Sequence, residues 1–290
     1  MNIEELFNNY LDSIQGKCSD STVDTYKNRY STAKKFLLSE ADTITNGEAQ
    51  ELIDRLNEQY ATKTVHGIYD VINAVYKKGV KEGYINKNPF ESVKVSDVQR
   101  HVPIILSVEQ TEALLKACED NISLYLPVLI AIETGLRRSQ VLALLWGDID
   151  FKNSKMSVSR NLISAKKHLF TPGKEHQKRT IAMTPRLSGT LLGVKNQRRD
   201  NGINVGDDEP VCLTSSSTFM EPTYFDKLFR KLVVGCEAVS DKLRFHDLRW
   251  TFINEQVRQG TDPMSIADLV GHKSCVFTMD YYYRFHHKAA

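Results

Sequence analysis

The 290-residue sequence has no apolar run that approaches the ~18 residues needed to span a bilayer. Residues 1–20 contain acidic and polar positions throughout, unlike a secretory signal peptide. Membrane insertion and export are therefore not expected, and the sequence predicts a cytoplasmic protein.

Cysteine is scarce as well. The chain has five cysteines, which lie far apart and form no CxxC pair. An odd number of widely separated cysteines argues against both a disulfide framework and a zinc site. The five are Cys18, Cys118, Cys212, Cys236 and Cys275.

Net charge is also low, at +2, far below that of a strongly basic nucleic-acid binder. Bulk charge alone therefore does not indicate a DNA partner. The sequence contains neither a GxxxxGK[ST] phosphate-binding loop nor an HExxH pair, so it indicates neither P-loop nor zinc-protease chemistry.

What is present is ordinary globular composition, with 41% hydrophobic and 26% charged residues. A chain of this length more often forms two modest domains than one. We expect a helical domain over 1–91, a polar linker over 92–104 and a second domain over 105–290. The predicted helices of the first domain cover 3–14, 26–37, 47–60 and 62–83, with Ser21 and Thr22 as N-caps of the second helix.

The second domain is predicted to be helical around a small sheet. Alternating residues over 155–158 and 179–183, with turn residues at 171–173 between them, indicate antiparallel strands. Ser107 and Gln110 resemble a capping box. The predicted helices cover 109–118, 125–134, 185–199, 223–234, 245–260 and 263–270. The fold class is mainly α (α+β).

Two arginine motifs suggest phosphate chemistry. Thr134-Gly-Leu-Arg137 follows a buried helix, and His246-Asp-Leu-Arg249 opens another. A guanidinium fork can bind two non-bridging oxygens of a phosphodiester under attack. His246 and Arg249, three residues apart on a helix, would share one face.

Two further clusters contain a possible acid and a possible nucleophile. The predicted hairpin over 171–181 contains Lys174 and Lys178, and an ammonium group there could protonate a leaving oxygen. Near the end of the chain, Gly271-His272 precedes Thr278-Met-Asp-Tyr-Tyr-Tyr283. On a helix, neighbouring tyrosines point about 100° apart, so only one of the three can face a phosphate.

In this order, the four clusters resemble the TGLRxxE box, the lysine hairpin, the HxxR box and the LLGHxS…TMxxY ending of the tyrosine recombinase (phage integrase) family. The resemblance covers nearly the whole chain, because 1–91 is similar to the family's helical core-binding domain and 105–290 to its catalytic domain. It implies the tyrosine recombinase fold and site-specific DNA strand exchange, with no cofactor and no metal. Gln140 departs from the pattern, since an acid usually stands there and buttresses the arginine.

The resemblance also implies catalytic roles. Arg137, Arg249 and His272 would stabilise the pentavalent transition state, and His246 would accept a proton or bind the phosphate. Lys174, or less readily Lys178, would protonate the 5′ oxygen.

The nucleophile would be one of the three tyrosines. The TMDxY register selects Tyr282, a shorter spacing after His272 would select Tyr281, and Tyr283 is the remaining choice. Because only eight residues follow Tyr282, we expect the family's C-terminal docking tail to be absent or replaced.

The implied partners are double-stranded DNA recombination sites and three further copies of the chain, as a homotetramer on a Holliday junction, with no membrane involved. Since the chain opens directly on the helical domain, we expect no additional arm-binding domain. Basic positions on the second and fourth predicted helices are candidate phosphate contacts, namely Lys27, Arg29, Lys34, Lys35, Lys63, Lys77, Lys78 and Lys81.

Two other functions are compatible with these motifs. A DNA-binding protein of the same fold that has lost catalysis is suggested by Gln140. A type IB topoisomerase would use similar residues but would relax supercoils as a monomer.

Overall fold

The computed structural model describes residues 1–37, 41, 43–99, 101–167, 169–174, 178–272, 274–276 and 279. It divides into two compact units, Met1–His101 and Val102–Ala290. Within the described residues, no helix is both long and apolar enough to cross a membrane.

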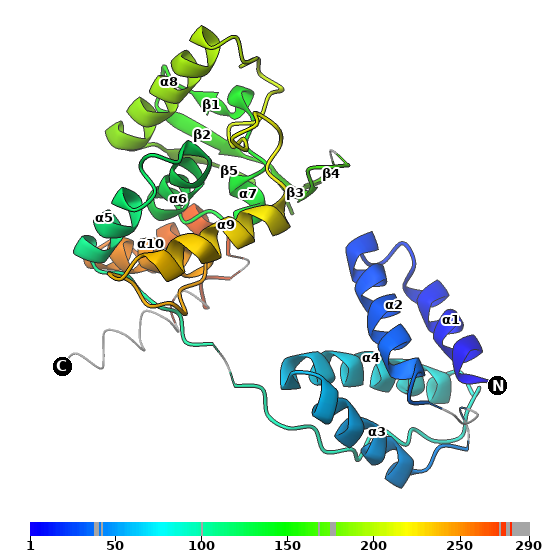
Figure 1. Ribbon diagram of the computed structural model, residues 1–290. Helices are drawn as coiled ribbons and strands as arrows, with labels where there is room; N and C mark the ends of the chain where they lie inside the picture. Colours follow the sequence, from blue (N-terminus) through cyan, green and yellow to red (C-terminus); the bar gives the residue numbers. More distant parts are fainter. Residues whose placement is uncertain are drawn as a thin grey trace. The chain divides into compact units, whose positions relative to one another are not determined.

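The N-terminal unit is a bundle in which one long helix packs against the other three (Figure 1). This central helix, α4 (Thr62–Lys81), is lined by buried residues at helical spacing, including Ile68, Val71 and Val75. Across the bundle, the rings of Phe7 and Tyr30 stack with centroids 3.8 Å apart. The helices are α1 (Ile3–Ile14), α2 (Asp20–Lys34), α3 (Asn46–Gln59) and α4 (Thr62–Lys81).

Two details differ from the sequence expectations. The N-cap of α2 is Ser19, so the prediction of Ser21 and Thr22 was wrong, because the helix already begins at Asp20. Part of the segment predicted as linker packs on the N-terminal core through Val93 and Val95.

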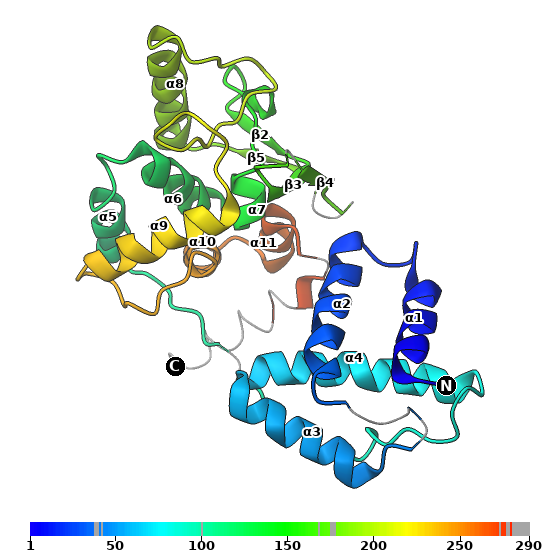
Figure 2. The same cartoon turned by 45° about the vertical axis from the view of Figure 1, so that its right-hand side comes forward.

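The C-terminal unit is built around an almost completely buried helix, α6 (Ile122–Thr134). It packs against α5 (Val108–Lys116), α7 (Arg138–Val141) and three later helices. Ser107 and Gln110 form the predicted capping box of α5. The three later helices that pack against α6 are α8 (Pro185–Asp200), α9 (Pro222–Gly235) and α10 (Asp247–Arg258), and α11 (Pro263–Val270) packs against α10 (Figure 2).

A three-stranded antiparallel sheet of order β1-β2-β5 and a separate hairpin, β3-β4, complete this unit. The two stretches predicted from alternation pair directly, with Met156 opposite Ile181. The strands are β1 (Ile149–Asp150), β2 (Lys155–Val158), β3 (Arg160–Ser164), β4 (Leu169–Pro172) and β5 (Arg179–Ala182), and β1 follows a 3-10 turn, η1 (Trp146–Asp148). The expected mainly α fold with a small antiparallel sheet is confirmed.

Candidate active site

The turn between α6 and α7 positions Arg137. Gly135 closes α6 with a φ of +63°, a left-handed conformation that favours glycine. Arg137 is the N-cap of α7, and its backbone N–H donates to Oε1 of Gln140 at 3.2 Å. Gln140 is only 1% exposed. A neutral amide therefore holds the backbone of Arg137 where the family pattern has a carboxylate.

The start of α10 positions His246 and Arg249. His246 is the exposed N-cap, so it lies just before the helix and not within it as predicted. Its backbone is in the right-handed helical region, which continues the helical path into Arg249. Arg249 is 2% exposed, and its Nη1 donates to the carbonyl oxygen of Gly135 at 2.7 Å. This bond joins the first turn of α10 to the end of α6.

The end of α11 positions His272. Gly271 terminates the helix with a φ of +66°, and the His272 backbone N–H donates to the Ala267 carbonyl at 2.9 Å. Two arginines donate to carbonyls at the same end. Arg137 Nη2 reaches Gly271 O at 3.4 Å, and Arg179 Nε reaches Leu269 O at 2.6 Å. Carbonyls at a helix C-terminus carry partial negative charge, which suits these cations.

The electrostatics show that these side chains form one cluster. The pKa of His272 is lowered to about 3, chiefly by burial and then by the positive charges of Arg249, Arg137, His246 and Arg179. Burial and the charges of Arg137 and Arg179 also lower the pKa of the Arg249 guanidinium well below its usual value. Burial and then Arg137 lower the pKa of Arg179 to about 10.

Such a cluster favours anion binding, because a bound anion would offset the mutual repulsion of the cations. Two buried guanidinium nitrogens, Arg137 Nη1 and Arg249 Nη2, have no hydrogen-bond partner within the described part of the chain. Buried donors of this kind are costly unless a ligand satisfies them. A tetrahedral or pentavalent phosphorus centre supplies several acceptor oxygens to a small volume, which fits this arrangement.

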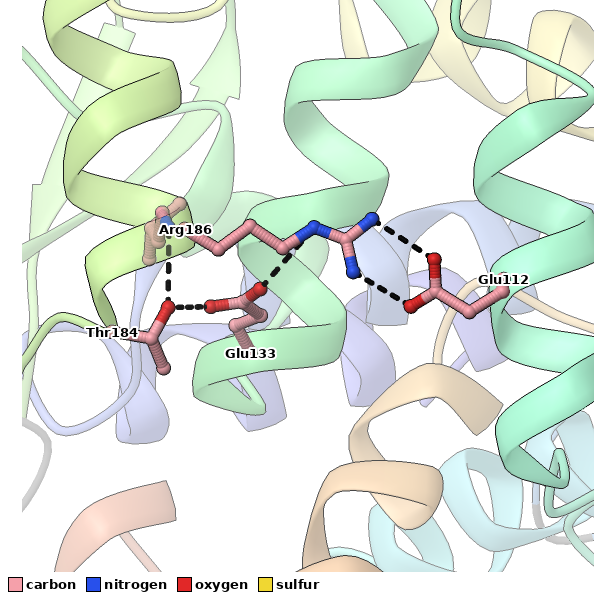
Figure 3. Close-up of polar contacts among 5 residues, drawn as sticks. Glu112, Glu133, Thr184 and Arg186 are labelled. Atoms are coloured by element: carbon pink, nitrogen blue, oxygen red, sulfur yellow. Dashed lines mark hydrogen bonds and ion pairs between the residues drawn. The ribbon is translucent and has the colours of Figure 1, made fainter.

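A polar network links α5, the end of α6 and the start of α8 (Figure 3). Arg186, at the start of α8, makes two hydrogen bonds to the Glu112 carboxylate, at 2.6 and 3.1 Å, and its Nε lies 4.0 Å from Glu133 Oε1. The Thr184 hydroxyl, which caps α8, also contacts the Glu133 carboxylate. The end of α6, just before Gly135, is thereby tied to the segment that follows β5.

The remaining predicted catalytic residues lie differently. Lys174 is exposed and follows Gly173, whose N–H donates to the Ser159 carbonyl at 2.7 Å. Lys178 is exposed and directly precedes β5. The structure therefore brings together Arg137, His246, Arg249 and His272 but shows no contact between Lys174 and them. Tyr281, Tyr282 and Tyr283 lie outside the described residues.

The predicted DNA-contacting residues all lie on or directly after α2 and α4. Three of them make contacts inside the N-terminal unit: Lys34 pairs with Glu4 at 2.7 Å, Lys78 pairs with Glu82, and the Arg29 guanidinium packs over Gly67. The others are exposed, namely Lys27, Lys35, Lys63, Lys77 and Lys81. Their contact with DNA stays a prediction.

Comparison with known proteins identifies the family of the chain. The model of the phage integrase family matches residues 105–288, and that of the phage integrase SAM-like domain matches residues 2–95. The chain belongs to the phage integrase family.

Among its relatives in this family is the transposase from transposon Tn916 of Enterococcus faecalis, 25% identical over 256 residues. That match covers 83% of this chain and 63% of the relative, so the chain spans under two thirds of that protein's length. The tyrosine recombinase XerC of Pediococcus pentosaceus is 22% identical over 97% of this chain and 93% of its own. A solved structure of the Tn1549 transposon integrase, in complex with a circular intermediate DNA, superposes with a TM-score of 0.83 at 21% identity, covering 97% of this chain and 95% of that one.

Sequence reasoning missed Arg179 as a member of the cluster. Its position held the information, because the alternation that buries Ile181 places Arg179 on the same face of β5. An arginine on the inward face of a strand needs a polar partner, and here that partner is the end of α11.

Proposed function

We propose that this phage integrase family member is a site-specific tyrosine recombinase, which breaks and rejoins DNA through a 3′-phosphotyrosyl intermediate. The observation that carries the proposal is the convergence of Arg137, Arg249 and His272, with two buried guanidinium nitrogens that have no hydrogen-bond partner among the described residues. The family membership of the whole chain supports the same conclusion. We further propose that the partner is double-stranded DNA in the cytoplasm.

The proposed chemistry is an in-line transfer at phosphorus. The hydroxyl oxygen of Tyr282 attacks the scissile phosphate, and its proton passes to His246. As the Tyr282–phosphorus bond forms, the bond from phosphorus to the 5′ oxygen breaks, and Lys174 supplies the proton to that oxygen. Attack by a 5′ hydroxyl of a partner strand reverses these steps and releases the tyrosine, so the bond energy is kept.

The charges of the site suit this transfer. Arg137 and Arg249 come from different helices and can bind different oxygens of one phosphate, while the surrounding burial strengthens each interaction. In the DNA-free protein, burial and the neighbouring positive charges lower the pKa of His272 to about 3, so it is neutral there and adds no further positive charge to the cluster. Because the neutral Gln140 adds no countercharge, the full positive charge of the arginines acts on the phosphate.

The proposal also implies an assembly. Exchange of both strands between two duplexes breaks four phosphodiesters, and each protomer offers one arginine cluster. Four protomers therefore supply one site for each break, which supports a homotetramer on the synapsed DNA.

Covalent trapping tests the proposal. Duplexes bound by the full chain are selected from a random pool, and the selected site is nicked so that the fragment with the 5′ hydroxyl dissociates after cleavage and cannot be rejoined. Wild type should form a denaturant-resistant adduct, as should Tyr281→Phe and Tyr283→Phe, whereas Tyr282→Phe should form none. No adduct from wild type on a tightly bound site would refute the enzyme and favour a DNA-binding role. Relaxation of plasmids without site preference would indicate a topoisomerase.

A further inference from the structure

β5 connects two parts of the proposed active site. Its first residue, Arg179, donates from Nε to the Leu269 carbonyl at 2.6 Å, a short charge-assisted hydrogen bond. Leu269 belongs to the last turn of α11, two residues before Gly271, where carbonyls have no helical partner of their own. The same strand directly follows the segment that contains Lys174 and Lys178.

The other end of β5 is also anchored. Beyond Ala182, Thr184 contacts Glu133, and Arg186 lies between Glu133 and Glu112 (Figure 3). Glu133 lies close in sequence to Gly135 and Arg137. The strand is thus fixed at one end to the α6 turn that presents Arg137 and at the other to the helix end that presents His272.

Arg179 makes this second attachment in a place where its charge is unfavourable unless an anion is present. Arg179 lowers the pKa of Arg249 and of His272, and the charge of Arg137 in turn lowers the pKa of Arg179. A neutral side chain in its place would avoid this repulsion. The hydrogen bond to α11 and the attraction of the added positive charge for a bound anion are the contributions that can offset this repulsion.

We propose that Arg179 is a positioning residue of the active site: by binding the Leu269 carbonyl, it fixes the last turn of α11, and hence His272, against β5, the strand that follows Lys174 and Lys178. This inference rests on the proposed function and adds a residue to it. Arg179 acts through His272 and need not contact the reacting atoms.

Two variants disturb the bond to Leu269, one with the positive charge kept and one without it. Arg179→Lys keeps the charge but lacks the Nε–H that reaches Leu269. Arg179→Gln removes the charge and keeps a shorter N–H donor. Arg198→Lys is the matched control, because Arg198 is 7% exposed and likewise donates to a backbone carbonyl, Val211 O at 2.8 Å, yet does not contribute to the pKa shifts of the cluster.

The first measurement is amide hydrogen exchange by NMR in DNA-free protein. The N–H groups of Gly271 and His272 donate to Asp268 and Ala267 at 3.1 and 2.9 Å, so they report on the last turn of α11. Both Arg179 variants should speed exchange of these amides by roughly tenfold or more, with α6 amides unchanged. Arg198→Lys should leave them at the wild-type rate. Unchanged exchange in the Arg179 variants would overturn the proposal, whatever the activity of the protein.

The second measurement is the rate of adduct formation on the selected nicked site at saturating protein. Arg179→Lys should lower this rate by roughly tenfold or more while changing the dissociation constant for DNA less than about twofold, since a displaced group lowers the rate of chemistry more than binding. Arg179→Gln should cleave more slowly still. Faster exchange with a wild-type cleavage rate would also overturn the proposal. If wild type itself forms no adduct, the proposed function fails, and the exchange result still decides whether Arg179 holds α11.

Discussion

Replacing Gly135 by alanine tests the close packing behind the arginine cluster. Its φ of +63° is unfavourable for a residue with a Cβ, at about 1–2 kcal/mol. The added Cβ would also lie 2.6 Å from Cδ1 of Phe252 and 3.2 Å from Cγ1 of Val270. Overpacking of this kind costs about 1–3 kcal/mol. Gly135→Ala should therefore lower the free energy of unfolding of the C-terminal unit by about 2–5 kcal/mol.

Gly260→Ala is the matched control. Gly260 follows α10 in the same unit with a φ of +79°, and a Cβ there would meet nothing within 4 Å. It should show only the backbone cost, about 1–2 kcal/mol. The difference between the two variants isolates the contact with Phe252 and Val270.

Urea unfolding followed by tryptophan fluorescence measures both variants, because the only two tryptophans, Trp146 and Trp250, lie in the C-terminal unit. Equal destabilisation of Gly135→Ala and Gly260→Ala would refute the packing argument. Cleavage adds a second readout. Since the Gly135 carbonyl accepts from Arg249, a displaced backbone should slow adduct formation in Gly135→Ala and leave it unchanged in Gly260→Ala.

Three other predictions concern the charged groups. The pKa of His272 is about 3 in the folded chain and about 6.5 in the unfolded chain, so only the unfolded chain binds a proton between these values. The free energy of unfolding of wild type should therefore fall faster than that of His272→Gln as the pH drops from about 6.5 to 5. Parallel pH profiles of the two proteins would contradict this. Gln140→Glu should strengthen the hydrogen bond to the Arg137 backbone but weaken binding of inorganic phosphate, because the added negative charge offsets that of the arginines. Calorimetry measures the phosphate affinity, and tighter binding would contradict this prediction. Glu112→Gln breaks an exposed pair with Arg186, so it should cost only about 0–1 kcal/mol in urea unfolding and leave the cleavage rate unchanged; a larger loss would give the network a greater role.

Local patterns in the sequence predicted much of the fold. The bounds of α11 agree with the prediction, because Pro263 follows a capping aspartate and Gly271 supplies the left-handed end. The N-cap of α2 was missed, because Ser19, Ser21 and Thr22 lie close together in the sequence and the helix begins directly after the first of them. The alternation of β2 and β5 predicted a sheet, but their direct pairing across an intervening hairpin is a tertiary outcome.

The site was predicted only as separate motifs. Each of its three arginine hydrogen bonds joins two residues that are far apart in the sequence, with separations of 134, 114 and 90 positions. No local pattern therefore specifies that these residues meet. The three-residue spacing of His246 and Arg249 was readable, whereas the inclusion of Arg179 depends on how β5 packs against α11. The resemblance to a family supplied the link between the motifs, and physical reasoning from spacing alone did not.

The arginine anchors have a consequence for sequence divergence. Arg137, Arg179 and Arg249 each bind a main-chain carbonyl, at Gly271, Leu269 and Gly135 respectively. A carbonyl is present whatever side chain occupies its residue, so drift at such a position leaves the acceptor in place as long as the backbone path is kept. Only the two glycines, whose left-handed φ angles end the helices, constrain that path strongly. The geometry of the site can therefore persist through extensive substitution around it, and compensating changes in partner side chains are not required.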